Sequence, residues 1–408
     1  MPFMIPASSR RAIELLVCSL LLAGCGDSSG GGGKTAQGVT RGPQVALASE
    51  DSITIAWLTG LPARGAVEYG VADASDDRVE EPGAGTEHVV VLSNLLAGTR
   101  YKYRLLLDGG VVGQDRTFST APADPSAPFR FAVLADCGSG SRHQARVGSR
   151  ILASDPAFVL IAGDVVYDSG APEEIDPHYF EPYEDLVERI PFYPALGNHD
   201  VRTEGGRPLL DALYLPSNNS EGTERYYSFD YGAAHFVALD SNASVSPGSL
   251  QRQWLEADLT QSSATWKFVY FHASPYSSSA HGSSLALREA LCPIFDAHHV
   301  DMVFTAHDHD YERTYPMMSE QVVQAGEEPD YTDPQGTVYV VTGGGGRSLY
   351  ASGKSFFTAF SESSYHFVRV DVDGLELRLE AIREDGSPLD HMSIRKSPPP
   401  ASLEPAGR

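Results

Sequence analysis

Seven side chains able to bind a metal ion stand at or just after apolar runs of the sequence. They are the carboxylates, phenol, amide and imidazoles of Asp136, Asp164, Tyr167, Asn198, His272, His307 and His309. All of them offer oxygen or nitrogen donors, which suit hard or borderline cations such as iron, zinc and manganese. Each residue alone is a weak signal, but their repeated position after apolar runs indicates a shared metal site.

The number of these candidates indicates two metal ions. One zinc ion takes about four ligands, so seven donors exceed what one ion requires. A carboxylate such as Asp164 can bridge two ions. Two ions roughly 3.5–4 Å apart can hold both the attacking and the leaving oxygen during displacement at phosphorus. The residues therefore predict a binuclear centre suited to phosphoryl transfer to water.

The elements that must position these side chains begin at Phe129. From there apolar, strand-like runs alternate with helical patterns, which predicts an α/β domain with a largely buried sheet. In open α/β sheets, ligands gather at the carboxyl ends of the strands. Five strand ends carry candidates, in "FRFAVLAD", "AFVLIAGD", "FYPALGNHD", "WKFVYFHASP" and "VDMVFTAHDH". We therefore expect these five ends to meet.

The part of the chain before Phe129 carries no such cluster. Residues 43–120 contain short alternating runs separated by Gly, Pro and Asp turns, which predicts an all-β sandwich. Trp57 and Tyr101 are expected to fill its core, with carbohydrate binding as the alternative. Residues 121–128 read as a Pro-rich linker, and residues 397–408 as a disordered tail.

The composition excludes one class of partner. The chain has 54 acidic and 30 basic residues and a formal net charge of −24. Binding to nucleic acid through phosphates requires clustered Lys and Arg, so we expect no nucleic acid partner. The sequence leaves the oligomeric state open.

The N-terminal segment has the pattern of a targeting signal. Arg10 and Arg11 precede an apolar stretch too short to span a bilayer. That stretch ends in "LAGC", which resembles the lipobox of bacterial lipoproteins and implies cleavage before Cys25 and lipidation of that residue. Residues 1–24 are thus predicted to be a lipoprotein signal peptide and residues 25–42 a flexible tether. Ordinary secretion is the alternative.

The lipobox resemblance also implies a location. The protein is expected in the bacterial cell envelope, bound to a membrane through lipid at Cys25. Gly26 follows that cysteine where an inner-membrane retention signal would have Asp, which favours the outer membrane, on its periplasmic or cell-surface side. Cys137 and Cys292 remain in the mature chain, and the sequence leaves open whether they form a disulfide.

Five motifs in order resemble a known family. The set "ADCG", "GDVVY", "GNHD", "FHASPY" and "AHDHDYER" is similar to that of the purple acid phosphatases, within the calcineurin-like metallophosphoesterases. The resemblance covers roughly residues 43–395. It implies a fibronectin type III-like sandwich at 43–120, followed by a catalytic domain at 129–396 built as a four-layer αββα sandwich of two mixed sheets.

The resemblance also implies a role for each residue. Fe³⁺ would be held by Asp136, Tyr167 and His309, and Asp164 would be shared between the ions. A second ion, Zn²⁺, Mn²⁺ or Fe²⁺, would be held by Asn198, His272 and His307. His199 would bind the phosphate and help to protonate the leaving alcohol. His281 would be a second substrate contact, with a solvated loop histidine as the alternative.

Several positions depart from the family pattern or replace part of it. Gly138 stands where many metallophosphoesterases have a ligand histidine, and Tyr167 is the residue with which purple acid phosphatases replace that ligand. Ala135 and Ala306 stand where glycine is usual. Asp200 is expected to orient His199 or to build its loop.

The predicted function is hydrolysis of phosphate monoesters by a metal-bound hydroxide, with a phosphate-ester small molecule as the substrate. A phosphodiesterase of the same superfamily is the near alternative. A non-catalytic surface-binding lipoprotein is the alternative from another class. The Gly-rich run at 343–346 is expected to pack tightly near the site, since no Walker-type lysine follows it.

Overall fold

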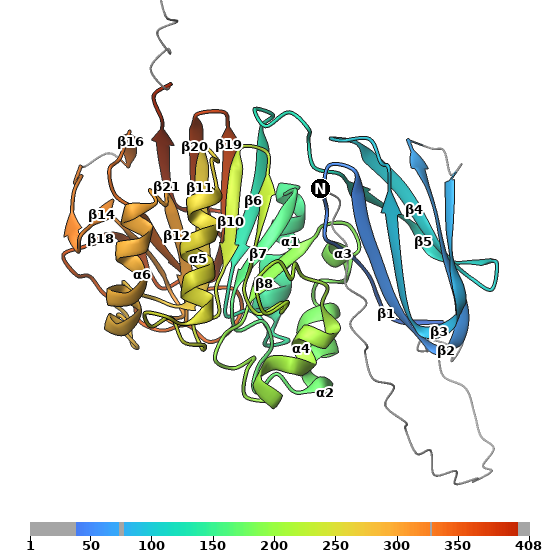
Figure 1. Cartoon of the computed structure of the whole chain (residues 1–408). Coiled ribbons are helices and arrows are strands. Elements are labelled where there is room, and N and C mark those ends of the chain that lie inside the picture. Colours follow the sequence, from blue (N-terminus) through green and yellow to red (C-terminus); the bar gives the residue numbers. More distant parts are fainter. Residues whose placement is uncertain (1–37, 73–76, 327–328, 399–408) are drawn as a thin grey trace, which may run out of the picture. The chain divides into compact units, whose positions relative to one another are not determined.

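A computed structural model of the chain describes residues 38–72, 77–326 and 329–398 (Figure 1). The predicted signal peptide, the predicted lipidation site Cys25 and most of the predicted tail lie outside these residues. Among the helices in the described ranges, none has both the length and the hydrophobicity needed to cross a lipid bilayer.

Five antiparallel strands form the N-terminal β region. They are β1 (Val39–Ala46), β2 (Ser52–Val71), β3 (Asp77–Ser93), β4 (Arg100–Leu107) and β5 (Gly110–Ser119). Two runs that the sequence pattern predicts as separate strands, "ITIAWLT" and "AVEYG", belong to the single strand β2. The register against β3 shifts between Leu58 and Ala63. Pro62 lies in this gap, and its missing N–H is tolerated where pairing is interrupted.

The core of this region contains both aromatic residues that the sequence predicts there. Trp57 is 2% exposed and Tyr101 is 5% exposed. The Trp57 ring stacks on His88 with the ring centroids 4.8 Å apart. This burial confirms the core prediction and removes both rings from any surface that could bind carbohydrate.

The first sheet of the α/β region contains strands from both ends of that region. Its order is β16-β21-β20-β19-β6-β7-β8. The strands are β6 (Phe129–Leu134), β7 (Phe158–Ala162), β8 (Phe192–Ala195), β16 (Asp330–Thr332), β19 (His366–Asp373), β20 (Glu376–Arg383) and β21 (Pro388–Arg395). The three strands β6, β7 and β8 run parallel, whereas β19 pairs antiparallel with β6, so this sheet is mixed.

The second sheet has the order β18-β13-β17-β12-β11-β10-β9. Its strands are β9 (Tyr227–Tyr231), β10 (Ala234–Ala238), β11 (Trp266–Ala273), β12 (Met302–Ala306), β13 (Tyr311–Thr314), β17 (Val338–Thr342) and β18 (Thr358–Glu362). The strands β10, β11, β12 and β17 run parallel, and antiparallel strands flank them. A separate short pair joins β14 (Met317–Met318) and β15 (Gln321–Val322).

The helices lie between these strands in sequence. They are α1 (Arg142–Ser154), α2 (Pro172–Ile175), a π-helix (Asp176–Phe180), α3 (Glu184–Val187), a 3₁₀ turn (Glu204–Gly206), α4 (Arg207–Ala212), α5 (Leu250–Gln261) and α6 (Leu285–Ala297). Ser141 and Ser249 cap α1 and α5 by accepting hydrogen bonds from backbone N–H groups in the first turn, which satisfies donors that a helix start leaves open.

Two cores show how the layers stack. Phe131 of the first sheet contacts Phe236, Phe268 and Phe304 of the second, so the two sheets face each other across buried aromatic rings. A second core joins the other face of the second sheet to α5 and α6, which lie over β10, β11 and β12 in Figure 1. The helix α1 contacts β19 of the first sheet. This order confirms the predicted αββα fold of two mixed sheets.

Candidate metal centre

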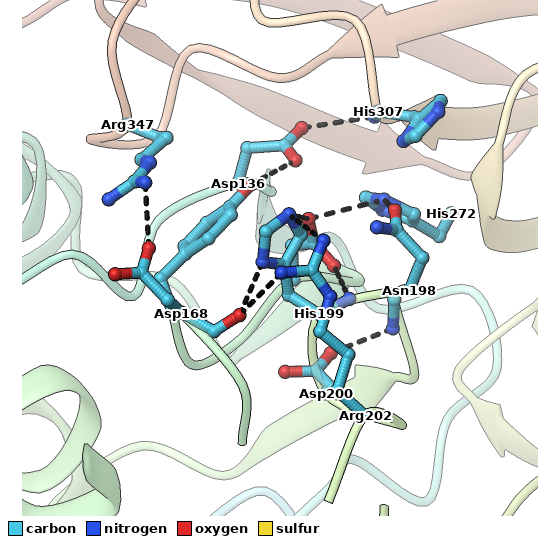
Figure 2. A network of polar contacts seen from close by, with 12 residues as sticks. Asp136, Asp168, Asn198, His199, Asp200, Arg202, His272, His307 and Arg347 are labelled. Atoms are coloured by element: carbon cyan, nitrogen blue, oxygen red, sulfur yellow. Dashed lines mark hydrogen bonds and ion pairs between the residues drawn. The ribbon is translucent and has the colours of Figure 1, made fainter. Parts of the chain in front are cut away.

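The predicted site residues meet where parallel strands of both sheets end. Three of the strands, β6, β7 and β8, belong to the first sheet, and β11 and β12 belong to the second. Parallel neighbours place their carboxyl ends on one edge, so residues from distant parts of the sequence are brought together. Figure 2 shows side chains from these strand ends and the loops after them gathered in one network. The predicted convergence is confirmed.

The first donor group contains Asp136, Tyr167 and His309. The hydroxyl of Tyr167 donates to Oδ1 of Asp136 at 2.8 Å and lies 3.2 Å from Nε2 of His309. That nitrogen is 3.4 Å from the same carboxylate oxygen. All three side chains are at least 90% buried, so a phenol, an imidazole and a carboxylate converge away from water.

The second donor group contains Asp164, Asn198 and His272. The Nε2 atom of His272 lies 3.0 Å from Oδ1 of Asn198 and 3.5 Å from Oδ2 of Asp164. Ligand atoms of Asp136, Asp164 and His272 all lie within 4.8 Å of one another. The two donor groups therefore adjoin, with the two carboxylates at their junction.

His307 lies beside both donor groups. Its ring centroid is 5.1 Å from that of His272, and its backbone N–H donates to Oδ2 of Asp136 at 3.1 Å. All seven predicted ligands thus lie in one cluster, although no hydrogen bond joins the His307 ring to the other six in the described part of the chain.

The Nδ1 atoms of His272 and His309 fix the orientation of these two rings. Nδ1 of His272 lies 3.1 Å from the carbonyl oxygen of Ala162, and Nδ1 of His309 lies 2.7 Å from that of Ser348. A carbonyl oxygen only accepts, so Nδ1 donates in both rings, and Nε2 is directed at the oxygen donors. Ligand histidines in metal proteins are held in this way.

The backbone at the site is unusual. Asp136, Asp164 and His307 adopt φ values of 51°, 50° and 74°. Residues with side chains seldom occupy this left-handed region, and such strain clusters at functional sites. Three of the seven predicted ligands are therefore held in a conformation that local preference does not favour.

Two glycines permit the close approach of loops around the carboxylates. A Cβ atom on Gly197 would lie 2.1 Å from Oδ1 of Asp164, and one on Gly343 would lie 2.6 Å from Oδ2 of Asp136. Neither space can hold a methyl group. Gly343 begins the Gly-rich run at 343–346, so the expected tight packing of that run beside the site is confirmed.

The two unusual alanines fit without disturbing the cluster. Ala135 and Ala306 are fully buried and pack with Ala162. These residues stand one or two positions before site residues of three neighbouring strand ends. The methyl groups therefore fill space between the two sheets instead of entering the metal centre.

Burial and nearby charges shift the pKa values of Tyr167 and Asp136. Burial, followed by the charges of Asp136 and Asp164, raises the pKa of Tyr167 far above its usual range. Burial by itself would raise the pKa of Asp136, but the hydrogen bond from His309 and the charges of His272 and His309 leave it below its usual value.

Burial and nearby charges shift the pKa values of the three ligand histidines in different directions. Burial opposes protonation of His272 and His309, yet the nearby carboxylates raise the pKa of both. Burial and the neighbouring rings of His272 and His281 lower the pKa of His307 to about 4. The centre therefore favours positive charge between its oxygen donors.

The donor set fits two metal ions. Nitrogen lone pairs and carboxylates face one another, which is favourable only with a proton or a cation between them. Ionisation of Tyr167 likewise requires a bound cation, because burial and the charges of Asp136 and Asp164 oppose the phenolate. Oxygen and nitrogen donors of this kind suit iron, zinc and manganese.

His199 lies at the edge of the cluster. Its Nε2 atom is 4.0 Å from Oδ2 of Asp164, and its backbone N–H donates to Oδ1 at 2.8 Å. Nε2 also lies 3.1 Å from Nη2 of Arg202. A guanidinium has no acceptor, so Nε2 accepts there, and Nδ1 donates to the backbone oxygen of Asp168 at 2.6 Å.

His281 is brought to the cluster by the loop after β11. Its exposed ring stacks on His307 with centroids 4.1 Å apart. Its backbone N–H donates to Oδ1 of Asp308 at 2.7 Å, and Ser277 donates to the other oxygen. The structure thus places the exposed ring of His281 beside a predicted ligand, with the Tyr350 ring edge-on to it at 5.5 Å between centroids.

Asp200 builds the loop that carries His199. Its carboxylate accepts from the backbone N–H groups of Val165, Val166 and Gly197 at 3.1, 2.9 and 2.7 Å. Burial, with the charge of Asp164, raises the pKa of Asp200 to about 7 against these three donors. Asp200 holds two strand ends together.

The two cysteines are buried and free, so no disulfide joins them. Cys137 lies in the core between the sheets and Cys292 in the core beneath α5 and α6. Burial raises the pKa of each thiol to about 12, which makes both thiols unreactive at neutral pH.

Sequence reasoning missed four residues at the margin of the cluster: Asp168, Arg202, Arg347 and Tyr350. The Tyr350 ring stacks on His309 with centroids 4.1 Å apart. The available signal was weak, namely a basic residue within four positions of "GNHD" or after the glycine run in a strongly acidic chain.

The fold and the site together define a class of protein. Residues 129–311 match the calcineurin-like phosphoesterase family. The chain therefore carries a calcineurin-like phosphoesterase domain at the position where the cluster lies. It is a phosphoester hydrolase, and its homologues are purple acid phosphatases.

The relatives agree with this class. The chain is 24% identical over 379 residues to acid phosphatase type 7 of Homo sapiens, across 82% of this chain and 85% of that protein. It is 27% identical over 359 residues to purple acid phosphatase 22 of Arabidopsis thaliana, across 80% and 78%.

A solved structure shares the fold. The purple acid phosphatase from yellow lupin (Lupinus luteus) seeds superposes with a TM-score of 0.78 at 21% identity. The match covers 89% of this chain and 77% of that one, so it includes both the N-terminal β region and the two-sheet region. The more specific likeness of residues 43–120 to fibronectin type III stays a prediction.

Proposed function

We propose that the protein hydrolyses phosphate monoesters at a centre of two metal ions, one Fe³⁺ and the other Zn²⁺, Mn²⁺ or Fe²⁺. The observation that carries the proposal is the junction of two donor groups at Asp136 and Asp164, with His199 beside them. A single ion would leave one of the two groups without a cation.

In this proposal the ligands divide between the ions. Asp136, Tyr167 and His309 would hold Fe³⁺, and Asp164 would be shared. The second ion would be held by Asn198, His272 and His307. Two such ions supply Lewis acidity toward the phosphate and lower the pKa of water to about 7.

The chain's own residues orient the ester and handle the proton. His199 would exchange its contact with Arg202 for a phosphate oxygen, take up a proton from solvent at Nε2, and then donate that proton toward the leaving oxygen. His281, exposed beside His307, is the second candidate donor. Asp200 keeps the His199 loop in place. No side-chain nucleophile is required, so no phosphoenzyme is expected.

The test uses the purified full chain. Metal content is measured first, followed by kcat/KM for p-nitrophenyl phosphate and for bis-(p-nitrophenyl) phosphate. We expect about two metal ions per chain, one of them iron, and at least about tenfold preference for the monoester. A reversed preference would identify a phosphodiesterase. Absence of turnover on both substrates by the fully metallated protein would refute the proposal.

We further propose that the protein is tethered to the cell envelope through lipid at Cys25, on the basis of the sequence "LAGC". The structural description begins at residue 38, so support comes from the sequence alone. Labelled palmitate should enter the wild-type protein and not the Cys25→Ser variant. Equal labelling of the two would contradict the tether.

A further inference from the structure

Two arginines from different loops converge at the margin of the metal centre (Figure 2). Arg202 follows the end of β8, and Arg347 follows the end of β17. Nη1 of Arg202 donates to the backbone oxygen of Asp168 at 3.1 Å, and Nη2 of Arg347 donates to its carboxylate Oδ1 at 2.7 Å. One residue, Asp168, therefore joins the two guanidinium groups.

Each guanidinium is one side chain away from the metal centre. Cζ of Arg347 lies 4.6 Å from the ring centroid of Tyr167, whose hydroxyl contacts Asp136. Nη2 of Arg202 lies 3.1 Å from Nε2 of His199. The two arginines thus stand beside the two donor groups on the side that carries His199.

Stability does not explain this arrangement. The side chains of Arg347 and Asp168 are 37% and 67% exposed, and exposed ion pairs contribute at most about 1 kcal/mol. The chain has 24 more acidic than basic residues, so its net charge repels anions. Two cations that converge beside a centre of phosphoester hydrolysis therefore point to an anionic ligand.

The chemistry of the group indicates which anion. A guanidinium presents five N–H donors and binds phosphate oxygens in pairs. The contacts in the structure engage one nitrogen of Arg347 and two of Arg202. The exposed carboxylate of Asp168 already contacts Arg347, and it can swing into solvent at little cost.

We propose that Arg202 and Arg347 form a second anion site that receives a further phosphoryl group of the substrate, with Asp168 holding that place in the free protein. The inference rests on the proposed function and narrows it to substrates with two or more phosphoryl groups. Binding draws Arg202 away from His199, which frees Nε2 to face the reacting phosphate.

The test compares two ligands that resist hydrolysis. Methylenediphosphonate carries two phosphoryl-like groups, and methylphosphonate carries one. Calorimetric titration of the metallated protein gives Kd for each. Arg347→Gln should weaken diphosphonate binding by about tenfold, because a charge-assisted pair is lost, and methylphosphonate binding by about twofold at most. Arg347→Lys should fall between the wild type and Arg347→Gln.

Two further variants sharpen the test. Asp168→Asn removes the competing carboxylate but keeps the backbone oxygen, so it should tighten diphosphonate binding. Arg378→Gln removes an arginine from β20, where its side chain is 71% exposed and paired with Glu376, and should change neither Kd. This control corrects for loss of one positive charge.

The outcomes separate this inference from the proposed function. Equal weakening of both ligands by Arg347→Gln would overturn the second anion site, even if the protein hydrolyses p-nitrophenyl phosphate. Conversely, an inactive protein whose diphosphonate affinity depends on Arg347 would retain the second anion site and refute the monoesterase.

Discussion

The hydroxyl of Tyr167 donates a 2.8 Å hydrogen bond to Oδ1 of Asp136, a residue 31 positions earlier in the chain. The contact arises because β6 and β7 are parallel neighbours, so the loops after them begin side by side. It places a phenol and a carboxylate at the position proposed for Fe³⁺.

Replacement of Tyr167 by Phe should remove one iron ligand without disturbing the fold, because the ring keeps its volume. We expect at least about tenfold weaker iron binding, as is usual even for changes in the surroundings of a metal. The visible absorption of a phenolate–iron pair should also vanish. Iron content and the visible spectrum check this, and an unchanged spectrum would exclude Tyr167 as the ligand.

Replacement of Asp164 by Asn should abolish metal binding and turnover. The loss should exceed about 100-fold, since neighbours of ligands alone account for 10–100-fold. Asp155→Asn is the matched control: Asp155 ends α1 with the same φ of 50° but lies outside the cluster. Asn tolerates this conformation, so the control should keep full metal content. A metallated, active Asp164→Asn protein would contradict the shared-ligand role.

Replacement of Gly343 by Ala should damage the centre from outside the ligand set. The new Cβ would lie 2.1 Å from the backbone oxygen of Asp308 and 2.6 Å from Asp136 Oδ2. We expect about 1–3 kcal/mol of destabilisation from this overpacking, together with weaker metal binding. Urea unfolding of the metal-free protein measures the first effect.

Gly83→Ala serves as the control for that experiment. No heavy atom lies within 4 Å of a Cβ placed on Gly83, so its stability and metal affinity should match the wild type. If Gly343→Ala behaves in the same way, the glycine run is not required for close packing around Asp136.

Stability should fall at alkaline pH because of His235. Burial opposes its charge, but hydrogen bonds to Asp230 and Asp258 raise its pKa to about 9 from 6.5. A raised pKa stabilises the fold fully below pH 6.5, and this contribution is lost as pH rises toward 9. We expect about 1–3 kcal/mol.

Chemical unfolding at pH 6 and at pH 9.5 measures this change. The comparison with His235→Gln isolates one group among many that titrate. The variant should lose less stability over this interval than the wild type. Parallel curves for the two proteins would exclude His235 as the cause.

The centre was largely predictable because its residues follow apolar strands directly. Asp136 and Asp164 come one or two residues after buried runs, and parallel pairing alone brings such ends together. His272 lies within β11 itself. In these cases the strand pattern determines the position of the side chain, and loop geometry matters little.

The residues at the margin of the site were not predictable, because loops and not strands position them. Arg202 and Arg347 reach it through loops whose course depends on tertiary contacts, such as the donation from the Arg347 N–H to the backbone oxygen of Asp136. The continuity of β2 through Pro62 also escaped prediction, since a proline within an alternating run usually marks a strand end. Whether Cys137 and Cys292 form a disulfide could not be predicted either, because the answer depends on their burial in two separate cores.

Both proposed ions draw ligands from both sheets. One would join Asp136 and Tyr167 of the first sheet to His309 of the second, and the other would join Asn198 of the first to His272 and His307 of the second. Bound metal would then link the two sheets of the domain to each other. A loaded centre would resist unfolding by about 2.7 kcal/mol at a hundredfold excess over Kd, and a chain with only one half folded would hold neither ion firmly.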